Sequence, residues 1–170
     1  MLIRKLIIDA LLILSIVGLL YTRYVDISLY GARPDLLLIF VTFIGLFEGK
    51  YHSIIFGFFG GLTIDIMSGS NLLGVNALMY TLIGYIAILP HKLFHIESVI
   101  LSPIVIFIFY LIKAFIYMIL AYIFFTTNSL AVYFNTIFMG EFIYTILISI
   151  PVFFIFKNIY SFMEKLKRYV

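Results

Sequence analysis

Long apolar stretches without charge follow one another through most of this 170-residue chain. Hydrophobic residues make up 65% of the sequence and charged residues only 11%. Soluble domains are roughly 45 to 50% apolar and about 25% charged. We therefore expect a membrane protein, and the question becomes how many times the chain crosses the bilayer.

Charged residues, prolines and Gly-Ser clusters interrupt the apolar sequence and divide it into segments. These breaks predict six transmembrane helices, at residues 6–21, 34–47, 53–67, 73–89, 100–125 and 133–156. Six helices of about 20 residues each use roughly 120 positions and leave only turns and tails. We expect an all-α polytopic protein with a single integral membrane domain over residues 1–170. No soluble catalytic or nucleic-acid-binding domain fits in the remainder.

The second and third of these segments are short for a full span. We expect them to tilt little, to sit in locally thinned bilayer, or to pack behind their neighbours. The first segment follows Arg4 and Lys5 as a secretory signal would, but no small-x-small cleavage site comes after it. We interpret it as a retained helix.

The distribution of basic residues predicts the orientation. With both termini in the cytoplasm, the outer loops contain only Arg23 and Arg33. The inner loops and tails then contain Arg4, Lys5, Lys50, Lys92, Lys157, Lys165, Lys167 and Arg168. Because cytoplasmic loops carry the excess of Lys and Arg, this topology is favoured. From Lys157 onward the chain can continue the last helix as an amphipathic end attracted to anionic lipid.

Three residues of the third segment form one stripe. Gly57, Gly61 and Asp65 are spaced four apart, so on a helix they share a face, and the glycines allow another backbone to approach closely. We expect this stripe to face protein, with Asp65 bonded either to the turn at residues 68–71 or to a neighbouring helix. Two other interpretations remain: Asp65 caps the turn at the membrane surface, or it belongs to a proton or ion relay.

The Arg33-Pro34-Asp35 sequence precedes the second segment. Proline is suited to a first helical turn, and a carboxylate there interacts favourably with the positive end of the helix. Arg33 is one of two basic residues expected on the outer side of the membrane, where basic residues are disfavoured. Asp26, Asp35 or Asp65 could pair with it.

Lys113 and Glu141 fall inside the fifth and sixth predicted helices, where isolated charges are expensive. An interhelical ion pair between them would satisfy both groups. The alternative is that Lys113 extends to one surface while Glu141 pairs elsewhere or is protonated.

The residue patterns of common catalytic and metal sites are absent or incomplete. His91 and His95 have helical spacing, but the residues between them lack the Glu of a zinc-protease helix, and no third ligand is apparent. Ser68 and Ser70 flank Gly69, yet no His lies within a predicted span to activate them. The chain has no Cys. We expect no enzyme activity, no cofactor and no nucleic-acid partner.

Several motifs of the central region occur in a recognisable order. They are Arg33-Pro34-Asp35-Leu36-Leu37-Leu38, Gly57 to Gly61, Asp65-Ile66-Met67-Ser68-Gly69-Ser70, Gly74-Val75-Asn76-Ala77, and Tyr80 to Gly84-Tyr85. This ordered set resembles the rod shape-determining membrane protein family MreD, and length, helix count and the basic C-terminal end are similar over the whole chain. The last two helices match only in hydrophobicity, so Lys113 and Glu141 inherit no role from the resemblance.

The resemblance implies a non-enzymatic scaffold of the bacterial cell-elongation complex in the inner (plasma) membrane. Members of that family associate with the bitopic protein MreC, and through it with MreB, RodA and a class B penicillin-binding protein, so that peptidoglycan synthesis is positioned along the cell. We expect MreC to be the direct partner, besides membrane lipids. The expected partner-binding or helix-packing residues are Arg33, Pro34, Asp35, Gly57, Gly61, Asp65, Ser68, Gly69, Gly74 and Asn76.

Two other functions stay open at this point. The helical arrangement of the family is similar to that of substrate-binding subunits of energy-coupling-factor transporters, so a vitamin-binding subunit is the alternative function. Such subunits carry Ala-x-x-x-Ala in the first helix, whereas here Ala10 is followed by Leu14. An ion channel would need a continuous polar path, which a few scattered charges do not establish.

Overall fold

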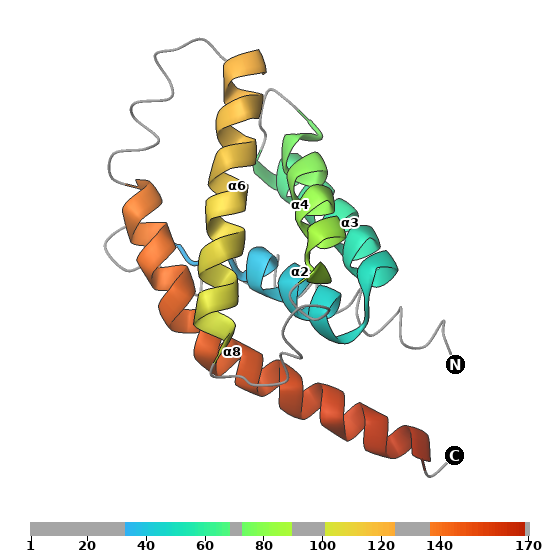
Figure 1. Ribbon diagram of the computed structural model, residues 1–170. Coiled ribbons are helices and arrows are strands. Elements are labelled where there is room, and N and C mark those ends of the chain that lie inside the picture. The colour runs from blue at the N-terminus through green and yellow to red at the C-terminus, as the bar shows by residue number, and fades with distance from the viewer. Residues whose placement is uncertain (1–32, 69–72, 90–100, 125–136, 169–170) are drawn as a thin grey trace.

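The computed structural model describes residues 33–68, 73–89, 101–124 and 137–168, and within these ranges it is all-helical without strands. This confirms the all-α expectation, and Figure 1 shows the arrangement. The helices are α2 (Leu36–Phe47), α3 (Lys50–Ser68), α4 (Val75–Ile86), α6 (Ser102–Phe124) and α8 (Ile137–Arg168). The expected first helix, at residues 6–21, lies outside the described residues.

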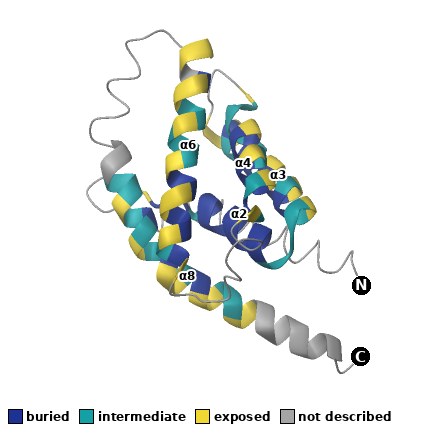
Figure 2. Ribbon diagram, viewed as in Figure 1, coloured by how far each residue is buried: buried dark blue, intermediate teal, exposed yellow. Residues whose placement is uncertain are grey.

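Helix α2 lies at the centre of the described helices. It has 12 residues, and every residue from Leu37 to Leu46 is buried. It contacts α3, α4, α6 and α8, and in Figure 2 it is dark blue along most of its length. A helix of this size is about 18 Å long, well short of the roughly 30 Å of a bilayer core. Of the arrangements expected for a short segment, the structure shows packing behind neighbours.

Both ends of α2 follow from local chemistry. Asp35 is the N-cap residue, and its side chain accepts a hydrogen bond from the Leu38 backbone N–H. At the other end the backbone N–H groups of Glu48 and Gly49 both donate to the Ile44 carbonyl oxygen. Gly49 has a φ of 94°, the left-handed conformation that commonly ends a helix and that glycine adopts without strain. The chain can therefore turn directly into α3.

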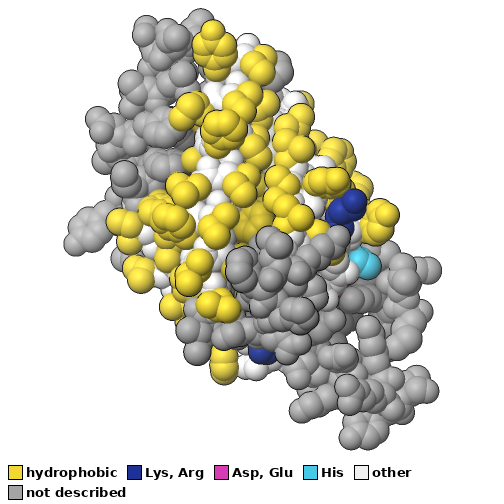
Figure 3. Space-filling model, in the orientation of Figure 1, with side chains coloured by type: hydrophobic (Ala, Val, Ile, Leu, Met, Phe, Trp, Pro, Cys, Tyr) yellow, Lys and Arg dark blue, Asp and Glu magenta, His cyan; other side chains and the backbone are white. Residues whose placement is uncertain are grey.

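Helices α3 and α4 form a tightly packed antiparallel pair, side by side in Figure 1. Their facing residues are small, whereas their outward residues are large and exposed, including Tyr51, Phe59, Leu78 and Tyr85. In Figure 3 the described part of the visible face is covered mainly by hydrophobic side chains over α6, α4 and α3. An apolar exterior of this extent is typical of a protein surrounded by lipid or by other transmembrane helices.

Helices α6 and α8 contain the two described segments that are long and apolar enough to cross a membrane, Ser102–Leu120 and Gly140–Ile159. Both helices contact α2, and α8 does so through aromatic residues: the ring centroids of Phe43 and Phe153 are 5.5 Å apart. Helix α8 runs past the predicted end at residue 156 and through Lys157 to Arg168 without a break, so the basic tail continues the last helix.

Candidate functional site

The Asp65 carboxylate joins α3 to the beginning of α4. It is fully buried and accepts four hydrogen bonds from the first residues of α4. The backbone N–H groups of Gly74, Asn76 and Ala77 donate at 3.0, 3.2 and 3.1 Å, and the Asn76 side-chain amide donates at 2.8 Å. The N-cap residue of α4, Gly74, has no side chain to perform this role. Asp65 therefore caps α4 from another helix, where the helix dipole also favours a negative charge.

The glycines of the same stripe bring the two helix backbones together. A Cβ atom added at Gly57 would lie 2.8 Å from the Tyr80 carbonyl carbon, and one added at Gly61 would lie 2.6 Å from the Ala77 Cα. Neither backbone atom can move aside without separating the helices. The stripe that the sequence predicts to face protein is thus occupied by α4 of the same chain, which leaves no room there for a partner helix.

The contact continues to the other end of the pair, where the small residue is on α4. A Cβ atom added at Gly84 would lie 2.8 Å from the Ser53 carbonyl carbon. Ser53 is fully buried, and its hydroxyl donates to the Val41 carbonyl oxygen of α2 at 2.7 Å. The α3–α4 pair is therefore also attached to the central helix.

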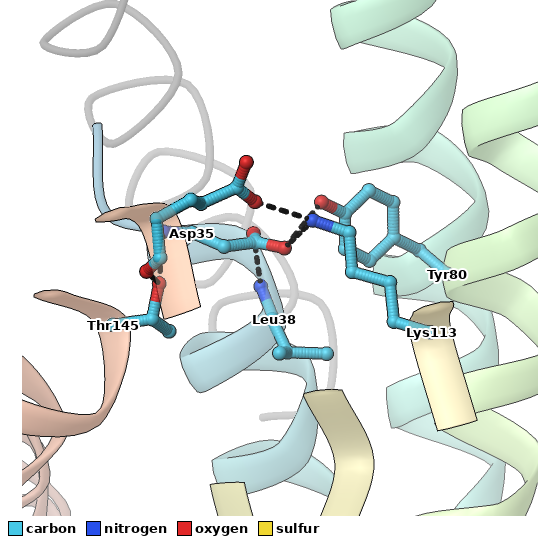
Figure 4. A network of polar contacts seen from close by, with 6 residues as sticks. Asp35, Leu38, Tyr80, Lys113 and Thr145 are labelled. Carbon is cyan, nitrogen blue, oxygen red and sulfur yellow. Dashed lines mark hydrogen bonds and ion pairs between the residues drawn. The ribbon is translucent and has the colours of Figure 1, made fainter. Parts of the chain in front are cut away.

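A second polar cluster surrounds the N-terminus of α2 (Figure 4). Its centre is Asp35, whose carboxylate points toward Tyr80 of α4 and Lys113 of α6. The Tyr80 hydroxyl donates to Asp35 Oδ2 at 2.8 Å, and Lys113 Nζ forms an ion pair with the same oxygen. The Asp35 backbone N–H donates to Thr145 Oγ1 of α8 at 2.9 Å. One residue thus binds three other helices.

Lys113 extends the cluster to a second carboxylate. Its Nζ atom lies 2.8 Å from Glu141 Oε1 of α8, so the interhelical pair that the sequence raises as one of two alternatives is present. The ammonium group also lies 5.3 Å from the centre of the Tyr110 ring and 5.9 Å from that of the Tyr80 ring. Aromatic faces at such distances add a favourable electrostatic interaction. We call Asp35, Tyr80, Lys113, Glu141 and Thr145 the four-helix network.

The buried charged groups of the network stabilise one arrangement of the four helices. The Lys113 and Asp35 side chains are only 14% and 5% exposed, so the charge of the Asp35 carboxylate depends on Lys113 for compensation. Removing one partner of a buried ion pair typically costs about 3 to 5 kcal/mol, because the other charge is left uncompensated. A displacement of α2, α4, α6 or α8 would therefore break a strong contact.

The structure differs from the sequence interpretation of Arg33-Pro34-Asp35 in two respects. Helix α2 begins at Leu36 and not at Pro34, so Asp35 is the cap and not part of the first turn. Asp35 also pairs across helices, with Lys113, in addition to its local role. Pro34 is buried and Arg33 is exposed.

The remaining predicted residues lie near the end of the α3–α4 pair where α3 ends and α4 begins. The Ser68 hydroxyl donates to the Asp65 backbone carbonyl oxygen at 3.2 Å. Gly74 has a φ of 101° and precedes α4. Gly69 lies outside the described residues, as do His91 and His95. Within the described ranges, no three His, Asp or Glu side chains are grouped so that they could hold a metal ion.

Sequence reasoning missed three members of these clusters. Tyr80 and Thr145 are common residue types in apolar helices, and their positions alone give no sign of a polar partner. Gly84, like Tyr80, appeared only as part of a family motif, although a glycine in a helix interior already indicates close approach of another backbone. Its partner, Ser53, belongs to the same i, i+4 series as Gly57 and Gly61.

Comparison with known protein families gives a match over most of the chain. The family model of the rod shape-determining protein MreD matches residues 2–163 of the chain. No curated protein and no solved structure was found to match.

Proposed function

Because the chain belongs to the MreD family of rod shape-determining proteins, we propose that it is a non-enzymatic scaffold of the bacterial cell-elongation complex. In this role it binds MreC in the inner (plasma) membrane and helps to position lateral peptidoglycan synthesis. Through MreC it associates indirectly with MreB, RodA and a class B penicillin-binding protein. The family match over nearly the whole chain is the observation that carries the proposal.

A positional mechanism is supported by how the buried polar groups are used. The Asp65 carboxylate binds the start of α4, and the Asp35 carboxylate binds Tyr80 of α4 and Lys113 of α6. Groups held in this way stabilise a defined arrangement of helices, which a scaffold needs in order to present a constant surface to a partner. The apolar exterior of α3, α4, α6 and α8 supports contact with lipid and with partner helices.

We propose a multi-pass topology with six transmembrane helices and cytoplasmic termini. The short α2 then passes through the membrane enclosed by its neighbours, so that its ends do not meet lipid. Because the chain has no Cys, single cysteines can be placed and labelled with a membrane-impermeant maleimide in intact cells. Asn128→Cys is expected to react from outside, and Lys167→Cys only after lysis. Labelling of Lys167→Cys in intact cells contradicts the topology.

The partner is tested by coexpression. The tagged chain and MreC are produced together in a rod-shaped host that lacks its own family member, and both copurification of MreC and recovery of rod shape are measured. The wild-type chain is expected to retain MreC and to restore rods. Gly61→Leu is expected to lose both, because the added side chain would meet the backbone of Ala77 and separate α3 from α4. Phe58→Leu, at an exposed position of α3, serves as the control and is expected to behave as wild type.

Two outcomes would count against this function. A wild-type chain that inserts into the membrane but neither retains MreC nor restores rod shape refutes the scaffold. A vitamin or similar small molecule that remains bound through purification favours the alternative, a substrate-binding subunit of a membrane transporter.

A further inference from the structure

The four-helix network contains more negative than positive charge. Asp35 and Glu141 are two carboxylates, and Lys113 is the one ammonium group that pairs with them in the described part of the chain. In their ionised forms the three groups leave one negative charge uncompensated. Because an isolated charge inside a membrane is expensive, such a cluster favours a positively charged partner.

Among the described residues, Glu141 accepts fewer hydrogen bonds than Asp35 does. Both oxygens of the Asp35 carboxylate accept hydrogen bonds, Oδ1 from Leu38 and Oδ2 from Tyr80 and Lys113. On Glu141, one oxygen binds Lys113, and no described group donates to the other. The Glu141 side chain is 17% exposed, so part of it lies at the surface of α8. Glu141 follows the beginning of α8 at Ile137 by about one turn.

The surface next to Glu141 has the spacing that suits another helix. Glu141, Ile148 and Ile155 recur at heptad spacing, with Tyr144 between the first two, and this is the pattern by which helices pack at a small crossing angle. Glu141, Tyr144 and Ile148 are half-buried, and Ile155 is 53% exposed. One side of Ile148 packs against the hydrophobic core, so only its other side is available to a partner. We call these four residues the α8 stripe.

We propose that the α8 stripe docks a transmembrane helix of the partner that carries a Lys or Arg side chain near its outer end, and that this basic group binds the open oxygen of Glu141. The ion pair neutralises the excess negative charge of the four-helix network, and Ile148 and Ile155 pack along the partner helix. The inference rests on the proposed function and names the contact through which the scaffold would hold a bitopic protein.

Charge complementarity favours a basic helix over a lipid headgroup. The phosphate of a membrane lipid would be repelled by a site that already has an excess carboxylate. A Lys or Arg side chain on an apolar helix can extend several ångströms toward the interface, and a charge-assisted hydrogen bond to a carboxylate is about twice as strong as a neutral one.

The first test is copurification of coexpressed MreC with the Glu141→Gln variant of the full chain. Glutamine keeps the size of the side chain and can accept a hydrogen bond from Lys113, but it removes the negative charge. We expect the retained MreC to fall about 10-fold or more, as is common when one member of a close interfacial ion pair is lost. Glu48→Gln, the same change at the turn between α2 and α3, is the matched control and is expected to retain MreC.

A second test leaves the network unchanged. Single cysteines are placed at Ile155 of the α8 stripe or at Leu111, which is 49% exposed on α6, and are paired with cysteines along the partner helix. Oxidative cross-linking in native membranes is expected for Ile155→Cys and not for Leu111→Cys. This measurement stands even if Glu141→Gln disturbs folding.

The outcomes separate this inference from the proposed function. If wild type retains MreC but Glu141→Gln retains it equally, or if cross-links form from Leu111→Cys and not from Ile155→Cys, the α8 stripe is not the docking surface although the scaffold stands. Cross-links from Ile155→Cys to a cysteine within residues 6–21 of the same chain would likewise overturn it. If wild type retains no MreC, both proposals fail.

Discussion

Replacement of Asp65 by alanine is expected to release the start of α4 from α3. In the folded chain the carboxylate is fully buried and accepts the backbone N–H groups of Gly74, Asn76 and Ala77, at 3.0 to 3.2 Å, together with the Asn76 side-chain amide. Alanine leaves these donors without an acceptor at the first turn of a helix, where no backbone carbonyl can replace it.

The magnitude follows from the number of donors. A buried donor without an acceptor costs about 1 to 3 kcal/mol, so three backbone N–H groups give at least about 3 kcal/mol of lost stability. For a chain of this size, each kcal/mol shifts the Tm by roughly 2 to 4 °C. Asp65→Ala is therefore expected to lower the Tm by about 6 to 12 °C. Asp65→Asn, which keeps one acceptor oxygen, is expected to fall between alanine and wild type.

The assay is thermal unfolding of the detergent-purified chain, followed by circular dichroism and by retention on size-exclusion chromatography. Thr63→Ala on the same helix is the control, because its hydroxyl bonds only the Phe59 carbonyl oxygen within α3, at 2.8 Å. An Asp65→Ala variant that unfolds at the same temperature as Thr63→Ala would show that the capping bonds contribute no net stability, and the reasoning would be refuted.

Three further substitutions address the other contacts, each measured by the same thermal unfolding. Gly57→Ala is expected to destabilise the fold by about 1 to 3 kcal/mol through overpacking, because the added Cβ would meet the Tyr80 backbone. An unchanged Tm would mean that α3 and α4 can separate without loss of stability. Lys113→Met is expected to lower the stability of the fold by about 3 to 5 kcal/mol, since it leaves two carboxylates uncompensated. Adding Asp35→Asn to this variant should recover part of the lost stability. If it recovers none, charge is not the cause of the loss. Tyr80→Phe removes one bond to a carboxylate that Lys113 still compensates, so a smaller loss of about 1 kcal/mol is expected, and a loss equal to that of Lys113→Met would contradict this ranking.

Much of the helical architecture could be predicted from the sequence because it depends on local composition. Apolar segments separated by charge and by Gly-Ser clusters place four of the expected helices within a few residues of α2, α3, α4 and α6. The stripe of Gly57, Gly61 and Asp65 was also predictable as a face that meets protein, since small residues and a carboxylate are unfavourable choices toward lipid.

The partners of those residues were not predictable. Helical periodicity shows which residues share a face but not which helix will cover that face, so Asp65 could equally have bonded its own turn. The structure selects the start of α4, because Gly57 and Gly61 permit an approach close enough for the carboxylate to reach three backbone N–H groups.

Asp35 shows most clearly what could not be predicted from the sequence. Its position before an apolar run is enough to predict a local role at a helix start, and that role is present. Its contacts with Tyr80, Lys113 and Thr145 join residues separated by 45, 78 and 110 positions. No local pattern encodes such separations, because they result from the packing of α4, α6 and α8 around α2.

The amino-acid sequence by itself determined that this protein resides in a lipid bilayer, that it is helical, and which helix faces avoid lipid. These properties depend on the transfer energies of individual side chains and on helical geometry. The tertiary structure alone decided that α2 is enclosed, that α4 fills the glycine stripe, and that one lysine is shared by two carboxylates. These features require the close packing of several helices at once, and only the assembled bundle brings their atoms within hydrogen-bonding distance.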